Sequence, residues 1–326
     1  MADLPRSRGH EDRTRASGES RAKPDAIASR PGLGIRNPRI SRSEHSFLRN
    51  RSCRSSDPRP SLAQPSSCVL SPIAIRHIAG VLPARWGSTR FPGKPLHPIA
   101  GKPLVQHVWE RCRMASRLDS LIVATDDQRI ADAVAGFGGT AVMTSADHPS
   151  GTDRIAEALR SIPQATHVVN IQGDEPLVDP VLIDRLADAI TTDDAPDMAT
   201  AANAIDPDDA AVQDPDVVKV VTGIHGRALY FSRSPLPFFR NRVPGLAVLR
   251  HKGIYAYSRA FIERFVAWPP SPLEQTESLE QLRALEHGAS ISVILTDDDS
   301  PGVDTPEQAR HIEALLARPH NGSSIP

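Results

Sequence analysis

The chain has 326 residues and a formal net charge of −1 at pH 7, with 39% hydrophobic and 24% charged residues. These proportions are typical of a soluble globular protein of one or two domains. No apolar run approaches the ~18 residues that a membrane-spanning helix needs, which excludes such a helix. Three scattered cysteines, Cys53, Cys68 and Cys112, exclude a disulfide framework and a CxxC zinc site, and they indicate a reducing compartment.

Residues 1–75 differ in composition from the rest of the chain. They hold 14 Lys/Arg, 7 Asp/Glu and only one aromatic residue, Phe47, and they show no sustained period of 2 or 3.6. Because so little apolar surface can be buried, we expect a disordered extension. Its role stays open between a leader without function, a targeting segment and a basic tail that binds nucleic acid or anionic lipid. The lack of a continuous apolar stretch argues against a secretory signal.

From His77 onward, strands and helices are predicted in alternation. The apolar runs and helical periods predict strands at 77–82, 121–124, 141–143 and 167–171, and helices at 103–118, 128–137, 151–159 and 180–190. Further strands are predicted at 198–204, 217–222, 228–232, 253–257 and 291–295, and helices at 279–287 and 305–316. This alternation indicates one α/β domain over residues 76–318, with a mostly parallel mixed sheet, followed by a flexible tail at 319–326.

Ligands of such sheets bind beyond the carboxyl ends of the strands. Functional residues are therefore expected in the loops that follow Leu82, Ala124 and Ile171. In the loop after Ala124, Thr125 and Asp126 are expected to cap the next helix.

The first of these loops is suited to a polyphosphate. It combines Arg85, Arg90 and Lys94 with Gly87 and Gly93, so three cations and close-lying backbone N–H groups can surround a highly charged anion. The sequence matches neither the Walker pattern GxxxxGK[ST] nor the GxGxxG pattern of dinucleotide-binding enzymes. The alternative is an ordinary surface loop with solvated charges.

Two aspartates that are distant in sequence form a candidate metal site. Asp174 and Asp304 each follow a predicted strand. Mg²⁺ prefers a few carboxylates together with phosphate oxygens and water, which such a pair can supply. From the residues alone, Asp304 fits equally well as part of the cap of the final helix.

A series of short motifs runs through residues 77–318. They are Pro83-Ala-Arg-x-x-Ser-Thr-Arg-x-Pro-Gly-Lys-Pro-Leu96, Val123-Ala-Thr-Asp126, Ser150-Gly-Thr-Asp-Arg154, Asn170-Ile-Gln-Gly-Asp-Glu-Pro176, Val218-Lys-Val220, Leu229-Tyr-Phe-Ser-Arg233, Arg250-His-x-Gly-Ile-Tyr255, Ser271-Pro-Leu-Glu274, Leu279-Glu-Gln-Leu-Arg283 and Pro301-Gly-Val-Asp-Thr-Pro306. In this order they resemble the sugar-acid cytidylyltransferases, most closely those that act on 3-deoxy-D-manno-octulosonate (KDO). The resemblance implies a single Rossmann-like nucleotide-diphospho-sugar transferase domain.

The resemblance also implies an activity. CMP is expected to pass from CTP to the anomeric 2-hydroxyl of KDO, with release of pyrophosphate and with Mg²⁺ as cofactor, in a cytoplasmic homodimer that serves lipopolysaccharide synthesis. Neither a membrane nor nucleic acid is expected as a partner. Three alternatives stay open: a cytidylyltransferase for 8-amino-KDO or sialic acid, a catalytically silent nucleotide-sugar binding protein, and a nucleic-acid-binding protein acting through the basic extension.

The matching positions imply roles for individual residues. Arg85 and Lys94 are expected to hold the β- and γ-phosphates. The catalytic set implied is Arg85, Lys94 and Asp174, the nucleotide-binding set is Ala84, Arg85, Ser88, Lys94 and Arg154, and the metal ligands are Asp174 and Asp304.

The resemblance assigns a second group of residues to the sugar acid, with Arg233 on its carboxylate. This group is Gln172, Arg233, His251, Tyr255, Glu280 and Gln281. Without the family, His251 fits a structural histidine, Tyr255 a core aromatic residue and Glu280 a solvated helix face. Three departures from the family pattern leave the identity of the sugar open: Trp86-Gly87, Lys252 where an apolar residue is usual, and a short 240–249 segment.

Overall fold

The computed structural model of the chain describes residues 76–87 and 91–317. The predicted extension at 1–75, the predicted tail at 319–326 and Ser88 lie outside the described residues. The strands are β1 (Ile78–Ala84), β2 (Pro98–Ile99), β3 (Lys102–Pro103), β4 (Ser120–Thr125), β5 (Ala141–Met143), β6 (His167–Asn170), β7 (Met198–Ile205), β8 (Lys219–Thr222), β9 (Ala228–Ser232), β10 (Val248–Ser258) and β11 (Ile291–Leu295).

Helices connect most of these strands. The α-helices are α1 (Leu104–Cys112), α2 (Gln128–Gly136), α3 (Gly151–Ala158), α4 (Pro180–Ile190), α5 (Arg259–Val266), α6 (Pro272–Glu277), α7 (Gln281–Glu286) and α8 (Pro306–Leu316). Three 3-10 turns, η1 (Lys94–Leu96), η2 (Leu159–Ser161) and η3 (Ala210–Val212), complete the described elements. No helix of residues 76–87 and 91–317 is long and apolar enough to cross a membrane.

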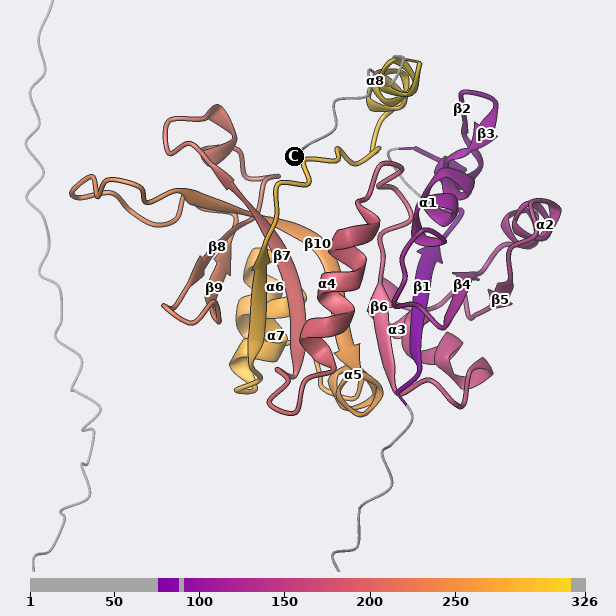
Figure 1. Cartoon of the computed structure of the whole chain (residues 1–326), viewed down its shortest axis with the longest axis horizontal. Coiled ribbons are helices and arrows are strands. Elements are labelled where there is room, and N and C mark those ends of the chain that lie inside the picture. Colours follow the sequence, from indigo (N-terminus) through magenta and orange to yellow (C-terminus); the bar gives the residue numbers. More distant parts are fainter. Residues whose placement is uncertain (1–75, 88–90, 318–326) are drawn as a thin grey trace, which may run out of the picture. The chain divides into compact units, whose positions relative to one another are not determined.

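The strands form one large twisted sheet (Figure 1). Its main path runs β11-β7-β10-β6-β1-β4-β5, and β8 and β9 continue from β10. Strands β6, β1, β4 and β5 pair in parallel, as do β11 and β7, whereas β10 is antiparallel to both of its neighbours on the path. The predicted α/β architecture with a mostly parallel mixed sheet is therefore confirmed.

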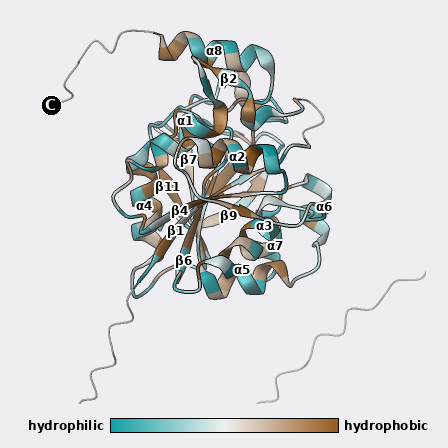
Figure 2. Cartoon of the chain, turned by 90° about the vertical axis from the view of Figure 1, so that its right-hand side faces the viewer, coloured by the Kyte–Doolittle hydropathy of each residue, from teal (hydrophilic) through white to brown (hydrophobic). Residues whose placement is uncertain are grey.

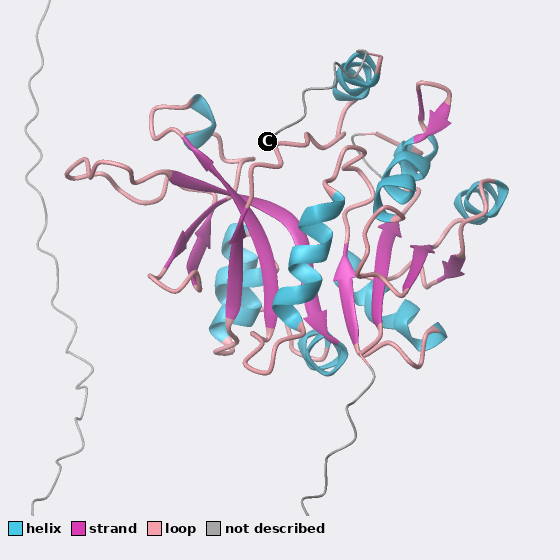
Figure 3. Ribbon diagram, viewed as in Figure 1, coloured by secondary structure: helices cyan, strands magenta, loops and turns pink. Residues whose placement is uncertain are grey.

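Alternate residues of β1 enter two apolar cores, because successive side chains of a strand point to opposite faces of the sheet. Ala79 and Val81 pack in the core that also receives α3, α5 and α7. Ile78 and Leu82 pack in the core that receives α1, α2 and α4. Figure 3 shows helices on both faces of the strands, and Figure 2 shows the strands as the hydrophobic interior. Because β1 is buried on both faces of the sheet, its sequence is a nearly continuous apolar run.

Several predicted boundaries are wrong for local reasons. Helix α1 ends at Cys112 and not at residue 118, because the Asp184 carboxylate accepts hydrogen bonds from the backbone N–H groups of Ser116 and Arg117. Asp127, and not Thr125 or Asp126, caps α2 by accepting from the N–H of Arg129 at 2.9 Å. Strand β10 is much longer than the predicted 253–257.

Two helices after β10 escaped the sequence prediction. Ser258 caps α5, and Ser271 and Glu274 form a capping box at the start of α6. The Ser-x-x-Glu spacing of a capping box is visible in the sequence, so this signal was available.

Helix α8 closes over the first loop. Thr305 caps it through a capping box with Gln308. Its buried residues Ala309 and Ile312 share a third core with Phe91 and Leu104. The C-terminal helix therefore holds the segment that carries Asp304 against the polyphosphate-type loop.

Candidate functional site

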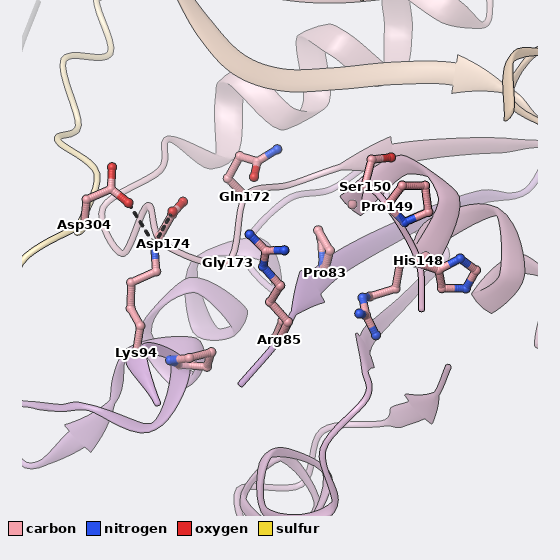
Figure 4. A pocket seen from close by; sticks show the side chains of 14 residues that line it. Pro83, Arg85, Lys94, His148, Pro149, Ser150, Gln172, Gly173, Asp174 and Asp304 are labelled. Carbon is pink, nitrogen blue, oxygen red and sulfur yellow. Dashed lines mark hydrogen bonds and ion pairs between the residues drawn. The ribbon is translucent and has the colours of Figure 1, made fainter. Parts of the chain in front are cut away.

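A pocket of about 340 Å³ lies beyond the carboxyl ends of β1 and β6 (Figure 4). It is where the sheet topology predicts a ligand. Its wall is built from four separate segments: Pro83, Ala84, Arg85, Lys94 and Pro95; His148, Pro149, Ser150, Gly151 and Arg154; Gln172, Gly173 and Asp174; and Asp304. The structure therefore brings Ala84, Arg85, Lys94, Arg154, Gln172, Asp174 and Asp304 of the predicted site residues to one cavity.

The floor of the pocket depends on a close approach between β1 and the loop after β6. Strand β6 pairs with β1 only as far as Val81, so Pro83 is not required to donate to that neighbour. Beyond this point Gly173 passes so close to β1 that a Cβ atom would lie 2.9 Å from the carbonyl oxygen of Pro83. A side chain at position 173 would displace the backbone that carries Asp174.

The first loop presents Lys94 through a tight turn. Gly93 has a φ of 70°, in the left-handed region that favours glycine, and a Cβ atom there would also lie 2.9 Å from the Trp86 ring. The guanidinium of Arg129 stacks 3.3 Å from the centroid of that ring. The turn begins η1, and Lys94 is its first residue.

Lys94 lies between the two predicted metal ligands. Its ammonium donates to Asp174 at 2.6 Å and to Asp304 at 3.1 Å (Figure 4). Burial alone would lower the pKa of Lys94, but the attraction and hydrogen bonds of the two carboxylates raise the pKa above its ordinary value. The lysine is therefore held charged at neutral pH.

Arg85 is a different kind of cation. It is exposed at the mouth of the pocket and makes no ion pair or hydrogen bond with any residue that the structure describes. Because no carboxylate of the described residues neutralises it, its charge is available to a bound anion.

The two aspartates are held together by the backbone. The N–H of Val303 donates to the carbonyl oxygen of Asp174 at 2.9 Å, which joins the loop after β6 to the segment after β11. The carboxylates converge on the Lys94 ammonium, and their side chains are 29% and 48% exposed.

This pair fits a hard divalent cation. Carboxylate oxygens are the ligands that Mg²⁺ prefers, and both side chains face a cavity wide enough for phosphate oxygens and water to complete the coordination. Among residues 76–87 and 91–317 there is no cluster of three or more His, Cys, Asp or Glu side chains arranged for a metal. Two carboxylates of this kind would leave the other positions around a bound cation to substrate oxygens and water.

The opposite wall of the pocket is built around Arg154. Ser150 caps α3, so the helix starts at the cavity. The Arg154 side chain is buried, and it donates to Thr144 at 2.6 Å and to Asp126 at 2.7 Å. Asp126, predicted to cap a helix, instead fixes the arginine that is predicted to lie near the nucleotide.

Gln172 is the one residue of the predicted sugar-acid group that lines this pocket. Its amide donates to the carbonyl oxygen of Gly253 on β10 at 2.9 Å. His251 and Tyr255 lie on the same strand, with ring centroids 5.4 Å apart. The His251 Nε2 lies 3.0 Å from the Thr200 hydroxyl. Burial lowers the pKa of His251 to about 3 and raises the pKa of the Tyr255 phenol, so both are neutral at pH 7.

The remaining sugar-acid candidates are engaged by the chain itself. The Arg233 guanidinium donates to the carbonyl oxygens of Glu277 at 2.8 Å and Pro215 at 2.9 Å. Glu280 accepts from the hydroxyls of Ser150 at 2.8 Å and Thr152 at 2.7 Å, which ties it to the rim of the pocket. Burial raises the pKa of Glu280, and these two hydrogen bonds oppose the rise.

Gln281 follows Glu280 in α7 but has a different environment. Its Nε2 is buried and has no hydrogen-bond partner among the described residues. A buried amide without a partner is unusual in a folded protein and suits a position that a ligand completes. The sugar-acid roles of Arg233, His251, Tyr255, Glu280 and Gln281 stay predictions.

Seven residues of the pocket wall were not named from the sequence as site residues. They are Pro83, Pro95, His148, Pro149, Ser150, Gly151 and Gly173. Ser150 and Gly173 lie inside motifs that carry the family resemblance, so a signal was present. No sequence pattern pointed to His148, because its Nε2 contacts Glu157 in the following helix, α3.

Comparison with known proteins gives three concordant matches. The family model described as Cytidylyltransferase matches residues 79–291. The 3-deoxy-manno-octulosonate cytidylyltransferase of Syntrophobacter fumaroxidans is 53% identical over 247 residues, which cover 74% of this chain and 97% of that protein. The 8-amino-3,8-dideoxy-manno-octulosonate cytidylyltransferase of Shewanella halifaxensis is 50% identical over 240 residues, covering 73% and 97%.

A solved structure agrees with these matches. It is CMP:2-keto-3-deoxy-manno-octonic acid synthetase complexed with CTP, with a TM-score of 0.71 and 44% sequence identity, and the match covers 74% of this chain and 98% of that chain. The matched family model spans the pocket residues from Pro83 to Asp174, and Asp304 lies beyond its end. From its sequence, its fold and these matches, the chain belongs to the cytidylyltransferase family.

Proposed function

We propose that this chain transfers CMP from CTP to the anomeric 2-hydroxyl of KDO, giving CMP-KDO and pyrophosphate, through a domain over residues 76–318. The observation that carries the proposal is the pocket itself. It sets Arg85, a cation without a partner among the described residues, and Lys94, a carboxylate-bound cation, beside two converging aspartates at the carboxyl ends of parallel strands. The relatives that are about half identical to this chain carry the corresponding enzyme name or that of its 8-amino variant.

The nucleotide triphosphate is proposed to lie along the first loop. Arg85 and Lys94 contact the β- and γ-phosphates, and Ala84 and Arg154 border the rest of the nucleotide, with Ser88 in the same loop. Phosphoryl-type transfer depends mainly on positioning and on neutralising charge, so fixed cations beside the leaving group are what the reaction needs.

The reaction is an in-line displacement at the α-phosphorus. The sugar 2-hydroxyl oxygen forms the new P–O bond, the bond to the bridging oxygen of the β-phosphate breaks, and the hydroxyl proton leaves to solvent. Arg85 and Lys94 stabilise the negative charge that the departing pyrophosphate gains.

Asp174 and Asp304 are proposed to hold Mg²⁺. When bound, the ion neutralises phosphate charge and lowers the pKa of a hydroxyl beside it. Asp174 and Asp304 would hold the ion in the place of the Lys94 ammonium, and Lys94 would then be available to the phosphates.

The sugar acid is proposed to lie between the pocket and β10. Gln172 borders both, and Arg233, His251, Tyr255, Glu280 and Gln281 form the remaining contacts. A second candidate, 8-amino-KDO, is favoured by the relative from Shewanella halifaxensis, which bears that substrate in its name at 50% identity.

Pyrophosphate release from CTP and Mg²⁺ tests the proposal directly. The full-length chain is assayed with KDO, 8-amino-KDO, sialic acid or no sugar. Release with KDO is the expected result. Release with another sugar acid alone would keep the nucleotide site and overturn the sugar assignment, and CTP binding without any release would indicate a silent binding protein.

A cytoplasmic homodimer is part of the proposal. Strand β9 and the loop before β10 expose large apolar side chains, namely Leu229, Phe238, Val243 and Leu246. Large apolar side chains that stay exposed in a single chain are the kind that protein interfaces bury. Light scattering after size-exclusion chromatography gives the mass, and a monomer at micromolar concentration would contradict the dimer.

A further inference from the structure

Lys252 is a buried cation outside the pocket. It lies on β10, 5% exposed, and it is not among the residues that line the cavity. We propose that Lys252 is a positioning residue that fixes the separation between the carboxylates of Asp174 and Asp304. This inference rests on the proposed function, because it assigns a role within the same site.

The Lys252 ammonium contacts two segments that are distant in sequence. Its Nζ lies 3.4 Å from the carboxylate of Asp298 and 3.7 Å from that of Glu175. It also donates to the carbonyl oxygen of Asp298 at 3.2 Å and to the hydroxyl of Ser300 at 3.1 Å. One side chain therefore spans the loop after β6 and the segment after β11.

Each of these segments leads directly to a site carboxylate. Glu175 is the neighbour of Asp174, and Ser300 lies a few residues before Asp304. The backbone hydrogen bond from Val303 to Asp174 joins the same two segments at the pocket. Lys252 thus forms a second connection between these segments, through residues that do not line the cavity.

The buried polar groups at this connection depend on Lys252. The side chains of Glu175 and Asp298 are only 14% and 6% exposed, and Glu175 Oε2 has no hydrogen-bond partner among the described residues. Without the ammonium, Asp298 and Ser300 lose a buried donor and Glu175 loses its ion pair. The two segments that carry Asp174 and Asp304 then lose this side-chain connection.

A β-bulge directs Lys252 to this position. The pairing of β10 with β7 shifts register between Lys252 and Tyr255. The Thr200 hydroxyl lies 3.1 Å from the carbonyl oxygen of Lys252 and 2.8 Å from that of Ile254, which holds the irregular backbone. The carbonyl oxygen of Gly253, within the bulge, accepts from Gln172. Bulges near active sites commonly aim a side chain in this way.

Two variants test the role of Lys252. Lys252→Met removes the charge at similar length, and Lys252→Arg keeps it. The milder Asp298→Asn variant loses one ion pair and is measured beside them, so that a folded protein is available even if Lys252→Met unfolds. Lys219→Met is the matched control, because Lys219 is equally buried but its ammonium donates to backbone carbonyl oxygens, including that of Asp214 at 2.9 Å.

Two readouts are independent of turnover. The first is Mn²⁺ binding, titrated by electron paramagnetic resonance in the presence of CTP and without sugar. The second is hydrogen exchange of the Val303 amide, which reports the connection between the two segments. Thermal unfolding is recorded for every variant.

The expected results separate positioning from general stability. Lys252→Met weakens Mn²⁺ binding about tenfold and accelerates Val303 exchange at least tenfold, Asp298→Asn does both about threefold, and Lys252→Arg restores most of each. Lys219→Met lowers the unfolding temperature but leaves Mn²⁺ affinity within twofold. Folded Lys252→Met or Asp298→Asn protein with wild-type Mn²⁺ affinity and wild-type Val303 exchange would overturn the inference, as would equal effects in Lys219→Met.

The failure of the proposed function is distinguishable from the failure of this inference. If the wild-type chain releases no pyrophosphate with any sugar acid, the proposed function fails. The exchange of the Val303 amide still tests Lys252 in that case, because it requires neither substrate nor reaction.

Discussion

The two sides of the proposed active site differ in how their polar groups are used. On the nucleotide side, Arg85 extends into the cavity without a partner among the described residues, and Lys94 is held only by the two carboxylates. On the sugar side, Arg233 donates to backbone carbonyl oxygens and Glu280 accepts from two hydroxyls. The first side is charged and open, whereas the second is largely satisfied by the protein itself.

This difference follows from the sheet. The nucleotide side is formed by loops at the ends of the parallel strands β1 and β6, where side chains leave the core and face solvent. The sugar side is formed along β9 and β10, where side chains remain within antiparallel pairing, and β9 packs against α7. Substitution of the open residue Arg85 should therefore change activity alone, whereas substitutions on the sugar side should change stability as well.

The largest effect on activity is expected when one charge of the acidic pair, Asp174 and Asp304, is removed. Asp174→Asn should abolish pyrophosphate release, by at least about a thousandfold, because a neutral amide is a poor ligand for Mg²⁺. The unfolding transition should survive, since the carboxylate is part-exposed. Steady-state kinetics and circular dichroism measure the two outcomes. Asp132→Asn, an exposed change on α2, is the control. Activity above a tenth of wild type would remove Asp174 from the metal site.

The next-largest effect on activity is expected for Arg85, the open cation of the nucleotide side. Arg85→Met should lower kcat/KM for CTP by about a hundredfold, which corresponds to about 2.7 kcal/mol of transition-state stabilisation. The unfolding temperature should stay within about one degree, because no described residue loses a partner. A clear loss of stability would show that Arg85 is engaged by the protein and would break the contrast.

The corresponding change on the sugar side, where the polar groups are hydrogen-bonded within the protein, is Arg233→Met. Removal of the guanidinium leaves the carbonyl oxygens of Glu277 and Pro215 without their donor, which should lower the free energy of unfolding by about 2 kcal/mol. Urea denaturation measures this loss, and KM for KDO should rise in the same variant. Unchanged stability with a raised KM would make Arg233 a free ligand of the sugar and no longer part of the scaffold.

The smallest effect is a pH dependence. The pKa of His251 is about 3 in the folded chain, so its ring stays neutral while an unfolded histidine takes a proton below about pH 6.5. Its contribution to stability is therefore complete above pH 6.5 and is lost as the pH falls from there toward 3, by at most about 1.4 kcal/mol per pH unit.

His251→Phe should flatten this slope between pH 6.5 and pH 5. The phenyl ring can keep the edge contact with Phe231, whose ring centroid lies 5.0 Å away. His225→Phe, at an exposed position, should leave the slope unchanged. Urea denaturation at several pH values measures both, and equal slopes in wild type and His251→Phe would contradict the buried neutral ring.

The sequence allowed the fold and the nucleotide side to be predicted for physical reasons. Buried parallel strands are short apolar runs, and the polar residues that follow them must face the sheet edge, so Arg85, Lys94 and Asp174 could be located from the strands alone. The convergence of Asp304 on Asp174 required the family resemblance, because nothing local to Asp304 reports a contact with a loop so distant in the chain.

Other features depended on tertiary contacts that leave no local pattern. Asp126 and Asp127 are adjacent carboxylates, and only the position of the buried Arg154 decides that the first pairs with it while the second caps α2. The role of Lys252 was equally hidden, because its register within a β-bulge determines which segments it reaches.

The hydrogen bond between Val303 and Asp174 has a consequence for biosynthesis. Every strand of the sheet precedes Val303 in the chain, so a nascent polypeptide can pair β1, β4 and β6 while its acidic pair is still incomplete. The site is assembled only when the segment after β11 leaves the ribosome and α8 docks on the first loop. The acidic pair is therefore completed late in the chain, and a chain truncated before Gly302 would retain the cations of the first loop and Asp174 but would lose Asp304.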